Sequence, residues 1–201
     1  MPEACAHPHL VEHTESREEL LRGRFLHVMR DTVRLPDGSR TTREYVVHPG
    51  AVMVIALLDD GRVVLERQFR YPVGQVMVEF PAGKLDAGEA LQLCAQRELL
   101  EETGYRAREW SRAGVMHPVI SYSTEFIEIW FARGLTAGQR KLDAGEFLDV
   151  YTATADQLLE DCRSGRVTDA KTLAGALWLQ NVNAGAWTLH WQAALPMPAH
   201  P

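Results

Sequence analysis

The stretch GKLDAGEALQLCAQRELLEETGY, residues 83–105, decides how the rest of the chain is interpreted. It begins with Gly83, reaches Gly104 near its end, and holds four glutamates and an arginine between them. Residues 91–103 have the composition of a helix, and a glycine directly after them supplies the left-handed residue that commonly ends one. Most of the remaining chain is therefore expected to be a scaffold that presents this segment and a pocket over it.

Three glutamates of this helix share one face. At about 100° per residue, Glu102 lies about 40° to one side of Glu98 and Glu101 about 60° to the other. Leucines of the same helix lie largely on the opposite side, where they can anchor it to a sheet. Like charges this close repel, and if the face is half buried a hard cation such as Mg²⁺ or Mn²⁺ is needed there. Helix geometry alone leaves a solvated acidic face equally open.

Three neighbours of this face complete a candidate cation site. Gly83 allows the backbone to pass close to the carboxylates, and the carbonyl oxygen of Ala82 could add a ligand. Arg97 adjoins the glutamates and can hold one of them in place through a bidentate pair. These residues suit a hard cation, but they do not by themselves identify a reaction.

Composition limits the class of protein. The chain has 201 residues, 46% of them hydrophobic, which suits one globular domain with a sizeable core and an appended subdomain. A net charge of −6 disfavours binding to nucleic acid or to an anionic membrane, and no apolar run approaches the roughly 20 residues of a membrane span. The first residues lack the pattern of a secretory signal, and the three cysteines are widely spaced. We therefore expect a cytoplasmic protein whose partners include neither nucleic acid nor membrane.

The order of segments predicts an N-terminal β subdomain ahead of a main domain. Residues 1–18 are expected to be a flexible N-terminus. Two β-rich runs follow, joined by Pro36-Asp37-Gly38-Ser39, a turn in which proline presets one torsion angle and glycine accepts a positive φ. We place the antiparallel β subdomain at residues 19–48, the main domain at 49–182 and a C-terminal tail at 183–201.

Two strands of the main domain have distinct patterns. Residues 51–58, AVMVIALL, form a continuous apolar run typical of a strand buried on both faces. Residues 62–71 alternate, so that Glu66, Gln68 and Arg70 fall on one face of the next strand. Such a charged set is unusual for a core and marks a candidate cleft wall.

Two further helices close the chain. Residues 155–165 and 169–182 have helical patterns, and Gly165 ends the first. Strands dominate the first three quarters of the sequence, with one helix in their midst. This order predicts an α+β fold, an α/β/α sandwich with a largely antiparallel core.

The spacing within the opening stretch resembles a known motif. Gly83 is followed after five residues by Glu89, and after seven more by Arg97-Glu98-Leu99-x-Glu101-Glu102-x-Gly104-Tyr105. This resembles the Nudix box in full, and Tyr105 in place of the usual aliphatic residue is its one mild departure. The resemblance implies a Nudix hydrolase with the Nudix fold, which cleaves a nucleoside diphosphate linked to another moiety with the help of Mg²⁺, or alternatively Mn²⁺.

Outside the box, the chain also resembles the ADP-ribose pyrophosphatase branch of this family. The resemblance implies that Arg43 and Glu44 contact the adenine moiety and that Arg70 reaches the phosphates or the terminal ribose. Glu79 opens the segment EFPAGK that leads into the box, and it is grouped with these substrate-binding residues. Glu146 lies in the loop LDAGEF, which resembles the catalytic loop where a glutamate serves as metal ligand or general base.

Each of these assignments has a plainer alternative. Arg43 and Glu44 could form a surface pair, and Arg70 could be part of a structural salt bridge. Glu146 could be an ordinary loop carboxylate, with Asp143 as its rival. Members of the branch often exchange their N-terminal strands within a homodimer. Such an exchange would place Arg43 and Glu44 in the active site of the neighbouring protomer.

The resemblance also implies a reaction and the residues that perform it. Two or three Mg²⁺ ions on the diphosphate would neutralise its charge and lower the pKa of a bound water. A carboxylate would take the proton of that water as it attacks phosphorus in line. ADP-ribose would give AMP and ribose 5-phosphate. The implied catalytic residues are Arg97, Glu98, Glu101, Glu102 and Glu146, and the implied metal ligands are the carbonyl of Ala82 and Glu98, Glu101, Glu102 and Glu146.

One segment departs from the pattern of the branch. Residues 117–123 read HPVISYS, with Ile120-Ser121 where Pro-Gly is common. Because this loop is expected to shape the substrate pocket, another ADP-sugar, a nicotinamide dinucleotide or a dinucleoside polyphosphate is an alternative substrate. A Nudix-fold sensor that binds ADP-ribose without cleaving it is disfavoured, because every box carboxylate is present and the short tail after Val182 cannot form a DNA-binding module.

Overall fold

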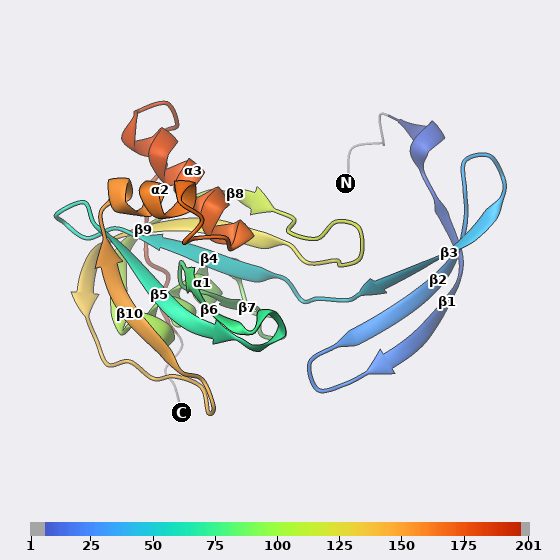
Figure 1. Ribbon diagram of the computed structural model, residues 1–201, viewed down its shortest axis with the longest axis horizontal. Helices are drawn as coiled ribbons and strands as arrows, with labels where there is room; N and C mark the ends of the chain where they lie inside the picture. Colours follow the sequence, from blue (N-terminus) through green and yellow to red (C-terminus); the bar gives the residue numbers. More distant parts are fainter. Residues whose placement is uncertain (1–6, 198–201) are drawn as a thin grey trace. The chain divides into compact units, whose positions relative to one another are not determined.

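The computed structural model describes residues 7–197, which fall into two compact units (Figure 1). The N-terminal unit comprises the chain up to Pro49 together with residues 119–125. The main unit comprises residues 50–118 and the chain from Phe126 onward. Among the described residues, no helix is both long and apolar enough to cross a membrane.

The N-terminal unit is an antiparallel sheet of three strands in the order β1-β2-β3. The predicted hairpin is present, because β2 and β3 are joined by a turn in which Gly38 has a φ of 85°. A short 3₁₀ helix η1 precedes the sheet. The bounds are η1 Pro8–Leu10, β1 His13–Arg22, β2 His27–Arg34 and β3 Arg40–Val46.

Strand β1 begins inside the segment that was predicted to be a flexible N-terminus. All ten of its side chains are exposed, so it lacks the alternating apolar pattern by which a strand is recognised in sequence. Its extended conformation comes from backbone pairing with β2, in which Arg17 lies opposite Asp31. The part of that prediction that concerns residues 1–6 lies outside the described residues.

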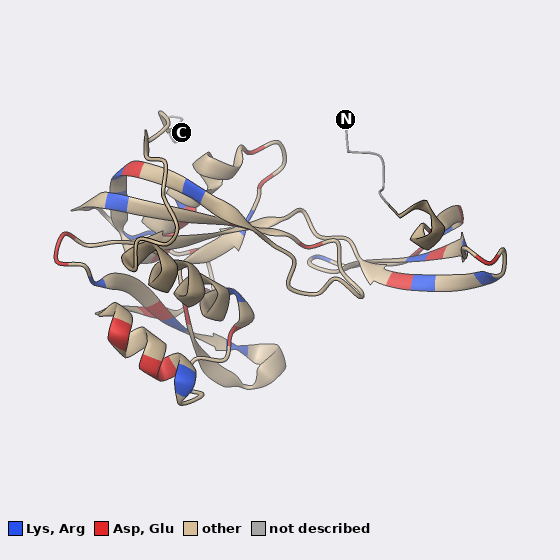
Figure 2. Cartoon of the chain, turned by 90° about the horizontal axis from the view of Figure 1, so that it is seen from above, with Lys and Arg blue, Asp and Glu red and all other residues tan. Residues whose placement is uncertain are grey.

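Ion pairs hold the sheet of the N-terminal unit together. Asp31, which is buried, accepts hydrogen bonds from Arg17 at 3.1 Å and from the hydroxyl of Tyr45 at 3.3 Å. Figure 2 shows acidic and basic residues interleaved along these strands. Residues 119–125 join the unit through β3, because the N–H of Val46 donates to the carbonyl of Tyr122 at 2.8 Å. Residues 119–123, which include the Ile120-Ser121 departure from the branch's pattern, therefore pack beside the end of β3.

The described part of the main unit contains two sheets, three α-helices and the short 3₁₀ helix η2. A five-stranded sheet has the order β11-β8-β9-β4-β7, and a three-stranded sheet has the order β10-β5-β6. Among the described strands of this unit the pairing is antiparallel as predicted, except between β4 and β9, which run parallel. The bounds are β4 Ala51–Ala56, β5 Val63–Arg70, η2 Tyr71–Val73, β6 Gln75–Glu79, β7 Ala82–Lys84, α1 Leu91–Thr103, β8 Tyr105–Met116, β9 Ile127–Ala137, β10 Leu148–Ala153, α2 Ala155–Arg163, α3 Ala170–Asn183 and β11 Gln192–Ala193.

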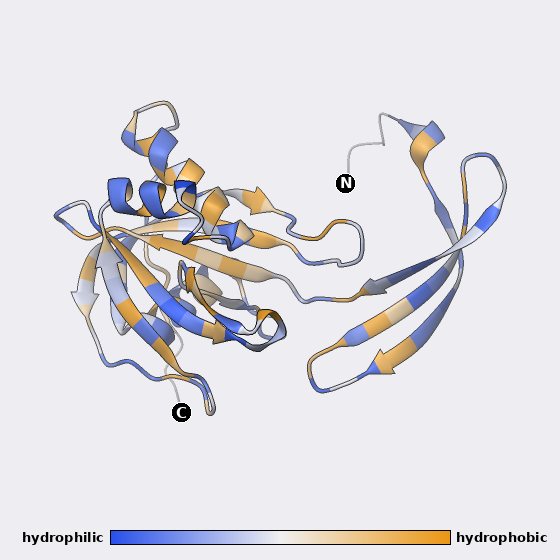
Figure 3. Ribbon diagram, viewed as in Figure 1, coloured by the Kyte–Doolittle hydropathy of each residue, from blue (hydrophilic) through white to orange (hydrophobic). Residues whose placement is uncertain are grey.

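Strand β4 is the centre of the core. All six of its residues are buried, as its apolar run predicted, and Figure 3 colours it mainly as hydrophobic. Met53 and Ile55 on one face pack in a cluster with α2 and α3, which lie side by side in Figure 1. Val52 and Val54 on the other face pack with Leu99 of α1. Helices therefore cover both faces of this sheet, and the predicted α/β/α sandwich is confirmed.

The three-stranded sheet of the main unit, β10-β5-β6, faces α1 on one side. Val64 of β5 and Val150 of β10 pack in the same cluster as Cys94 and Leu99 of α1. The described part of the C-terminal tail docks on this helix too, because Gln96 donates a side-chain hydrogen bond to the carbonyl of Leu195 at 2.9 Å. Helix α1 is thus enclosed, and the placement of its glutamates is set by the sheets around it.

Candidate active site

Helix α1 has the boundaries that its sequence predicts. It ends at Gly104, whose φ of 76° lies in the left-handed region and whose N–H donates to the carbonyl of Leu100 at 2.8 Å. Leu99 on the apolar side is fully buried, which fixes the rotation of the helix. Glu98, Glu101 and Glu102 consequently share the side that lies next to β7, in agreement with the helical spacing.

Gly83 in β7 makes room for the carboxylate of Glu98. A Cβ atom at position 83 would lie 2.0 Å from both Cδ and Oε1 of Glu98, far inside van der Waals contact. Strand β7 is held at this place by antiparallel pairing with β4, in which Gly83 lies opposite Val52. The absence of a side chain at position 83 therefore decides where the carboxylate of Glu98 can lie.

Arg97 joins three glutamates of the box. It donates to both oxygens of Glu89 at 2.9 Å, to Glu98 at 2.8 Å and to Glu101 at 3.0 Å, and it also reaches the carbonyl of Lys84 at 3.1 Å. These hydrogen bonds raise the pKa of Arg97, with Glu89 as the largest cause, and they lower the pKa of Glu89 in return. Arg97 thus holds the acidic side of α1 in one arrangement.

Glu102 and Glu98 are the most deeply buried carboxylates on α1. Glu102 accepts a hydrogen bond from the N–H of Ala82 at 3.0 Å, and its pKa is raised well above the ordinary value by burial and then by repulsion from Glu66, Glu98 and Glu146. Burial also raises the pKa of Glu98 to about 7, although Arg97 opposes the shift. Buried carboxylates that repel one another favour a bound cation.

Arg70 and Glu79 lie together on the wall formed by β5 and β6. Arg70 donates two hydrogen bonds of 2.7 Å to the two oxygens of Glu79. Lys171, in the first turn of α3, also bonds Glu79 and lies 3.1 Å from Asp169. Burial raises the pKa of Glu79, but the bonds from Arg70 and Lys171 outweigh it and leave the pKa lowered.

Glu146 lies close to the box glutamates although its loop is irregular. Its Oε1 accepts a hydrogen bond from Gln68 at 3.2 Å, and its Oε2 accepts one from the N–H of Asp143 at 3.4 Å. Its charge contributes to the raised pKa values of Glu98 and Glu102. Of the two rival carboxylates in this loop, the structure brings Glu146 to the cluster.

Arg43 and Glu44 belong to the N-terminal unit. Arg43 donates to both oxygens of Glu12, at 3.0 and 2.7 Å, and Glu44 accepts from Arg30 at 2.6 Å. Both residues lie on β3 and are exposed. The structure therefore describes both residues in surface ion pairs within the N-terminal unit.

The acidic group suits a divalent cation in its chemistry. Within residues 7–197, no three Asp, Glu, His or Cys side chains converge as a ready metal site, and Glu98 and Glu101 each accept a hydrogen bond from Arg97. The donors are nevertheless all oxygens, several are buried, and they repel one another. This set fits a hard ion such as Mg²⁺ or Mn²⁺ rather than Zn²⁺.

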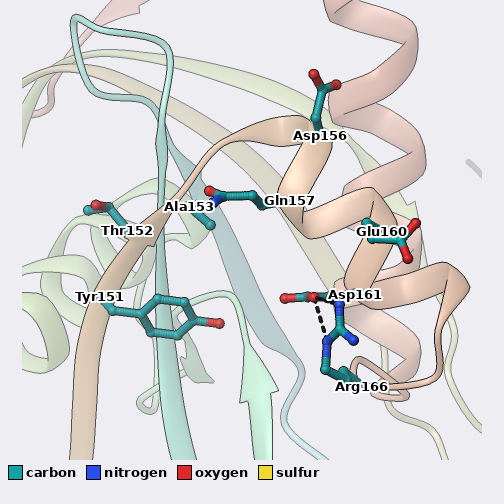
Figure 4. Close-up of a pocket in the computed structure, with 8 residues that line it drawn as sticks. All are labelled: Tyr151, Thr152, Ala153, Asp156, Gln157, Glu160, Asp161 and Arg166. Atoms are coloured by element: carbon teal, nitrogen blue, oxygen red, sulfur yellow. Dashed lines mark hydrogen bonds and ion pairs between the residues drawn. The ribbon is translucent and has the colours of Figure 1, made fainter.

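A separate pocket of about 580 Å³ opens between β10 and α2 (Figure 4). None of the box residues lines it, and its acidic side chains outnumber the single arginine, which bonds Asp161 at 2.7 Å. An anionic diphosphate does not suit such a lining. The lining residues are Tyr151, Thr152, Ala153, Asp156, Gln157, Glu160, Asp161 and Arg166.

Two charged residues near the site were not assigned from the sequence. Lys171 reaches Glu79 across 92 positions of the chain, and no local pattern announces such a contact. Glu66 is fully buried beside Glu79 and raises the pKa of Glu102. Its signal was present, because the alternation of residues 62–71 places it on the charged face of that strand.

Comparison with known proteins identifies the family. Residues 47–174 match the NUDIX domain, and residues 12–46 match the nucleoside diphosphate sugar hydrolase N-terminal domain. The chain belongs to the Nudix family, and it is a Nudix hydrolase, as the spacing of its box indicated. Members of this family generally use divalent metal ions.

Two relatives and one solved structure illustrate what the chain resembles. It is 36% identical to the ADP-ribose pyrophosphatase of Bacillus subtilis, over 85% of this chain and 94% of the relative. It is 38% identical to the methanol dehydrogenase activator of Bacillus methanolicus, over 84% of this chain and 92% of the relative. The crystal structure of an ADP compounds hydrolase superposes with a TM-score of 0.79 at 21% identity, covering 88% of this chain and 96% of the other, and confirms the fold.

Proposed function

We propose that this protein hydrolyses the diphosphate bond of ADP-ribose, giving AMP and ribose 5-phosphate, with Mg²⁺ as its cofactor. The carboxylates collected beside Gly83 and Ala82 are the observation on which this proposal depends. The relative named ADP-ribose pyrophosphatase supports the choice of substrate. Another ADP-sugar, a nicotinamide dinucleotide or a dinucleoside polyphosphate is the alternative.

The glutamates of α1 would hold the cation. Glu98 and Glu102, with Glu101 and the carbonyl of Ala82, present oxygen donors from α1 and β7, and Glu146 adds one from its loop. When bound, divalent cations neutralise the charge of a diphosphate and make water a better nucleophile. Arg97 keeps the glutamates in register by bonding three of them at once.

Other residues would bind the substrate and move a proton. Arg70, whose side chain is partly exposed, binds a phosphate oxygen or the terminal ribose. Glu79 is almost wholly buried and both its oxygens are engaged, so it orients Arg70 and does not itself contact the substrate. Glu146, or a box glutamate, takes the proton of the attacking water as its oxygen bonds to phosphorus. The leaving oxygen then departs with AMP or with ribose 5-phosphate.

The test compares substrates and variants side by side. Wild-type protein with Mg²⁺ should turn over ADP-ribose with a higher kcat/KM than the alternative substrates, measured by release of AMP. Glu98→Gln and Glu102→Gln should each lose at least about 100-fold in kcat while remaining folded. Glu160→Gln is the matched control, because the side chain of Glu160 is exposed on α2 and bonds Arg163 of the same helix. Near wild-type rates in both site variants would refute the proposed catalytic glutamates, and ADP-ribose binding without cleavage would favour a sensor.

We further propose that the protein is a cytoplasmic homodimer whose N-terminal strands are exchanged. The N-terminal sheet, β1-β2-β3, buries few side chains of its own. Together with the β1–β2 turn it exposes large apolar side chains, namely Leu20, Leu21, Phe25 and Leu26. A small sheet with so little core gains stability from a partner. With exchange, Arg43 and Glu44 would bind the adenine moiety in the partner's site.

Mixing two inactive variants tests the exchange. A hybrid of Arg43→Ala with Glu98→Gln would contain one site with both wild-type residues only if the strands are exchanged. Activity that returns on mixing, after dissociation and reassembly, supports exchange. A hybrid as inactive as its parents, shown by sedimentation to have formed, would refute it.

A further inference from the structure

Glu66 of β5 is a charged residue that the proposed reaction does not yet use. Its side chain is fully buried, with 0% of its surface exposed. Neither of its carboxylate oxygens has a hydrogen-bond partner among residues 7–197. A buried carboxylate without a partner is strongly unfavourable, so this position needs a compensating interaction that the neighbouring side chains do not supply.

The strand pattern directs Glu66 toward α1. Side chains two residues apart in a strand point to the same face, and Val64 packs in the cluster that contains Leu99 of α1. Val150, directly opposite Glu66 on β10, packs against the same cluster. Glu66 therefore lies on the face of the three-stranded sheet that looks at the helix bearing the box glutamates, with Glu79 directly opposite it on β6.

The basic side chains near Glu66 form ion pairs with Glu79 instead. Arg70 donates to both oxygens of Glu79, and Lys171 bonds Glu79 and Asp169. Their charges act on Glu66 only at a distance, and neither forms an ion pair with it. Two carboxyl groups lie opposite each other in adjacent strands, and Arg70 and Lys171 form ion pairs with that of Glu79.

The remaining neighbours of Glu66 are the carboxylates of the candidate metal site. After burial, repulsion from Glu66 is the largest cause of the raised pKa of Glu102, and Glu146 in turn repels Glu66. Gln68, two residues along β5 on the same face as Glu66, donates to Glu146 at 3.2 Å, so the loop that carries Glu146 lies over the face that looks at α1. An unpartnered, fully buried oxygen donor thus borders the group that would hold the cation.

We propose that Glu66 is an additional ligand of the divalent cation bound by Glu102 and its neighbours on α1. The inference depends on the proposed function, because it uses the same metal. It deepens that function by giving the cation a donor from the strand side as well as from the helix side. The bound ion would then connect β5 to α1 and compensate a carboxylate that forms no ion pair with Arg70 or Lys171.

The experiment is a Mn²⁺ titration of the chelator-treated full-length protein, with free Mn²⁺ counted by electron paramagnetic resonance. Four proteins are compared: wild type, Glu66→Gln, Glu102→Gln and the control Glu160→Gln. Glu66→Gln should bind its tightest Mn²⁺ at least about tenfold more weakly than wild type, and the control should be unchanged. Without metal, Glu66→Gln should melt at or above the Tm of wild type, because the neutral amide removes the cost of ionising a buried carboxyl group. With Mn²⁺, its rise in Tm should be smaller.

The possible failures are distinguishable. If Glu66→Gln binds Mn²⁺ within twofold of wild type while Glu102→Gln is weakened, Glu66 is not a ligand and the proposed function stands. If Glu102→Gln also binds as wild type does, the proposed metal site itself is refuted. Should Glu66→Gln not fold, Glu66→Asp replaces it. The shorter carboxylate should weaken Mn²⁺ binding, and wild-type affinity in that variant would overturn the inference.

Discussion

Gly83→Ala changes one methyl group at the point where β7 meets α1. The new Cβ would lie 2.0 Å from Cδ and Oε1 of Glu98 and 2.4 Å from its Oε2. Ordinary contacts begin at 3.4 Å, so the carboxyl group must withdraw by about 1.4 Å, the difference between 3.4 and 2.0 Å. A misplacement of about 1 Å at a reacting centre can cost about 100-fold in rate, and we expect at least that loss in kcat.

The same substitution should affect stability much less than activity. Position 83 does not have a positive φ, so alanine is compatible with the backbone. Overpacking costs about 1–3 kcal/mol, and the reduced entropy of the unfolded chain returns about 0.4–1 kcal/mol. The free energy of unfolding should therefore fall by no more than about 2.6 kcal/mol.

The assay pairs initial rates on ADP-ribose with urea denaturation. Gly23→Ala is the matched control, because its Cβ would meet nothing nearer than 3.5 Å and its φ is also not positive. The control should keep wild-type kcat. A Gly83→Ala protein that is folded and retains more than about a third of wild-type kcat would show that the place of Glu98 beside β7 does not matter, and the argument for the site would fail.

Three further predictions concern the charges of the site. Arg97→Gln removes the guanidinium group that three glutamates share, and the free energy of unfolding in urea without metal should fall by about 3 kcal/mol, partly recovered with Mg²⁺. The control Arg163→Gln removes one partner of an exposed ion pair and should cost under about 0.5 kcal/mol. Equal losses in the two variants would contradict the prediction. The lowered pKa of Glu79 contributes stability that is complete above about pH 4.3, the pKa of a glutamate in the unfolded chain, and that is lost as pH falls through the pKa of the folded state. Glu79→Gln should therefore reduce the loss of unfolding free energy below about pH 4. An unchanged slope of unfolding free energy against pH would contradict this prediction. Lys171→Met removes one of the ion pairs that fix Glu79, so Glu79 should orient Arg70 less firmly. The substitution should therefore raise KM for ADP-ribose more than it lowers kcat. A fall in kcat alone would exclude this positioning role for Lys171.

Local patterns were reliable where short-range geometry decides the structure. The cap at Gly104 depends on one residue that accepts a left-handed conformation, and the common face of Glu98 and Glu102 depends on the helical repeat. The burial of β4 could be predicted because its apolar residues are consecutive. The family could be predicted from the spacing of the box, because it is contained in one segment.

Long-range pairing could not be predicted in the same way. Strand β1 has only exposed side chains and is extended because β2 pairs with it. The parallel alignment of β4 and β9 joins segments more than seventy positions apart, with Ala51 opposite Ile127. Neither strand carries a local signal for the identity of its partner.

The sequence by itself determined the family, through the spacing of the box residues. Glutamates at helical spacing, a glycine before them and an arginine among them are local features, and they require only that the helix forms. The tertiary structure decided how the charges are shared. It placed Lys171 and Arg70 on Glu79, and it left Glu66 buried opposite α1 without a hydrogen-bond partner among residues 7–197. The physical reason is that the pairing of a buried charge depends on which distant segments the fold brings beside it, and packing of the whole chain sets that proximity.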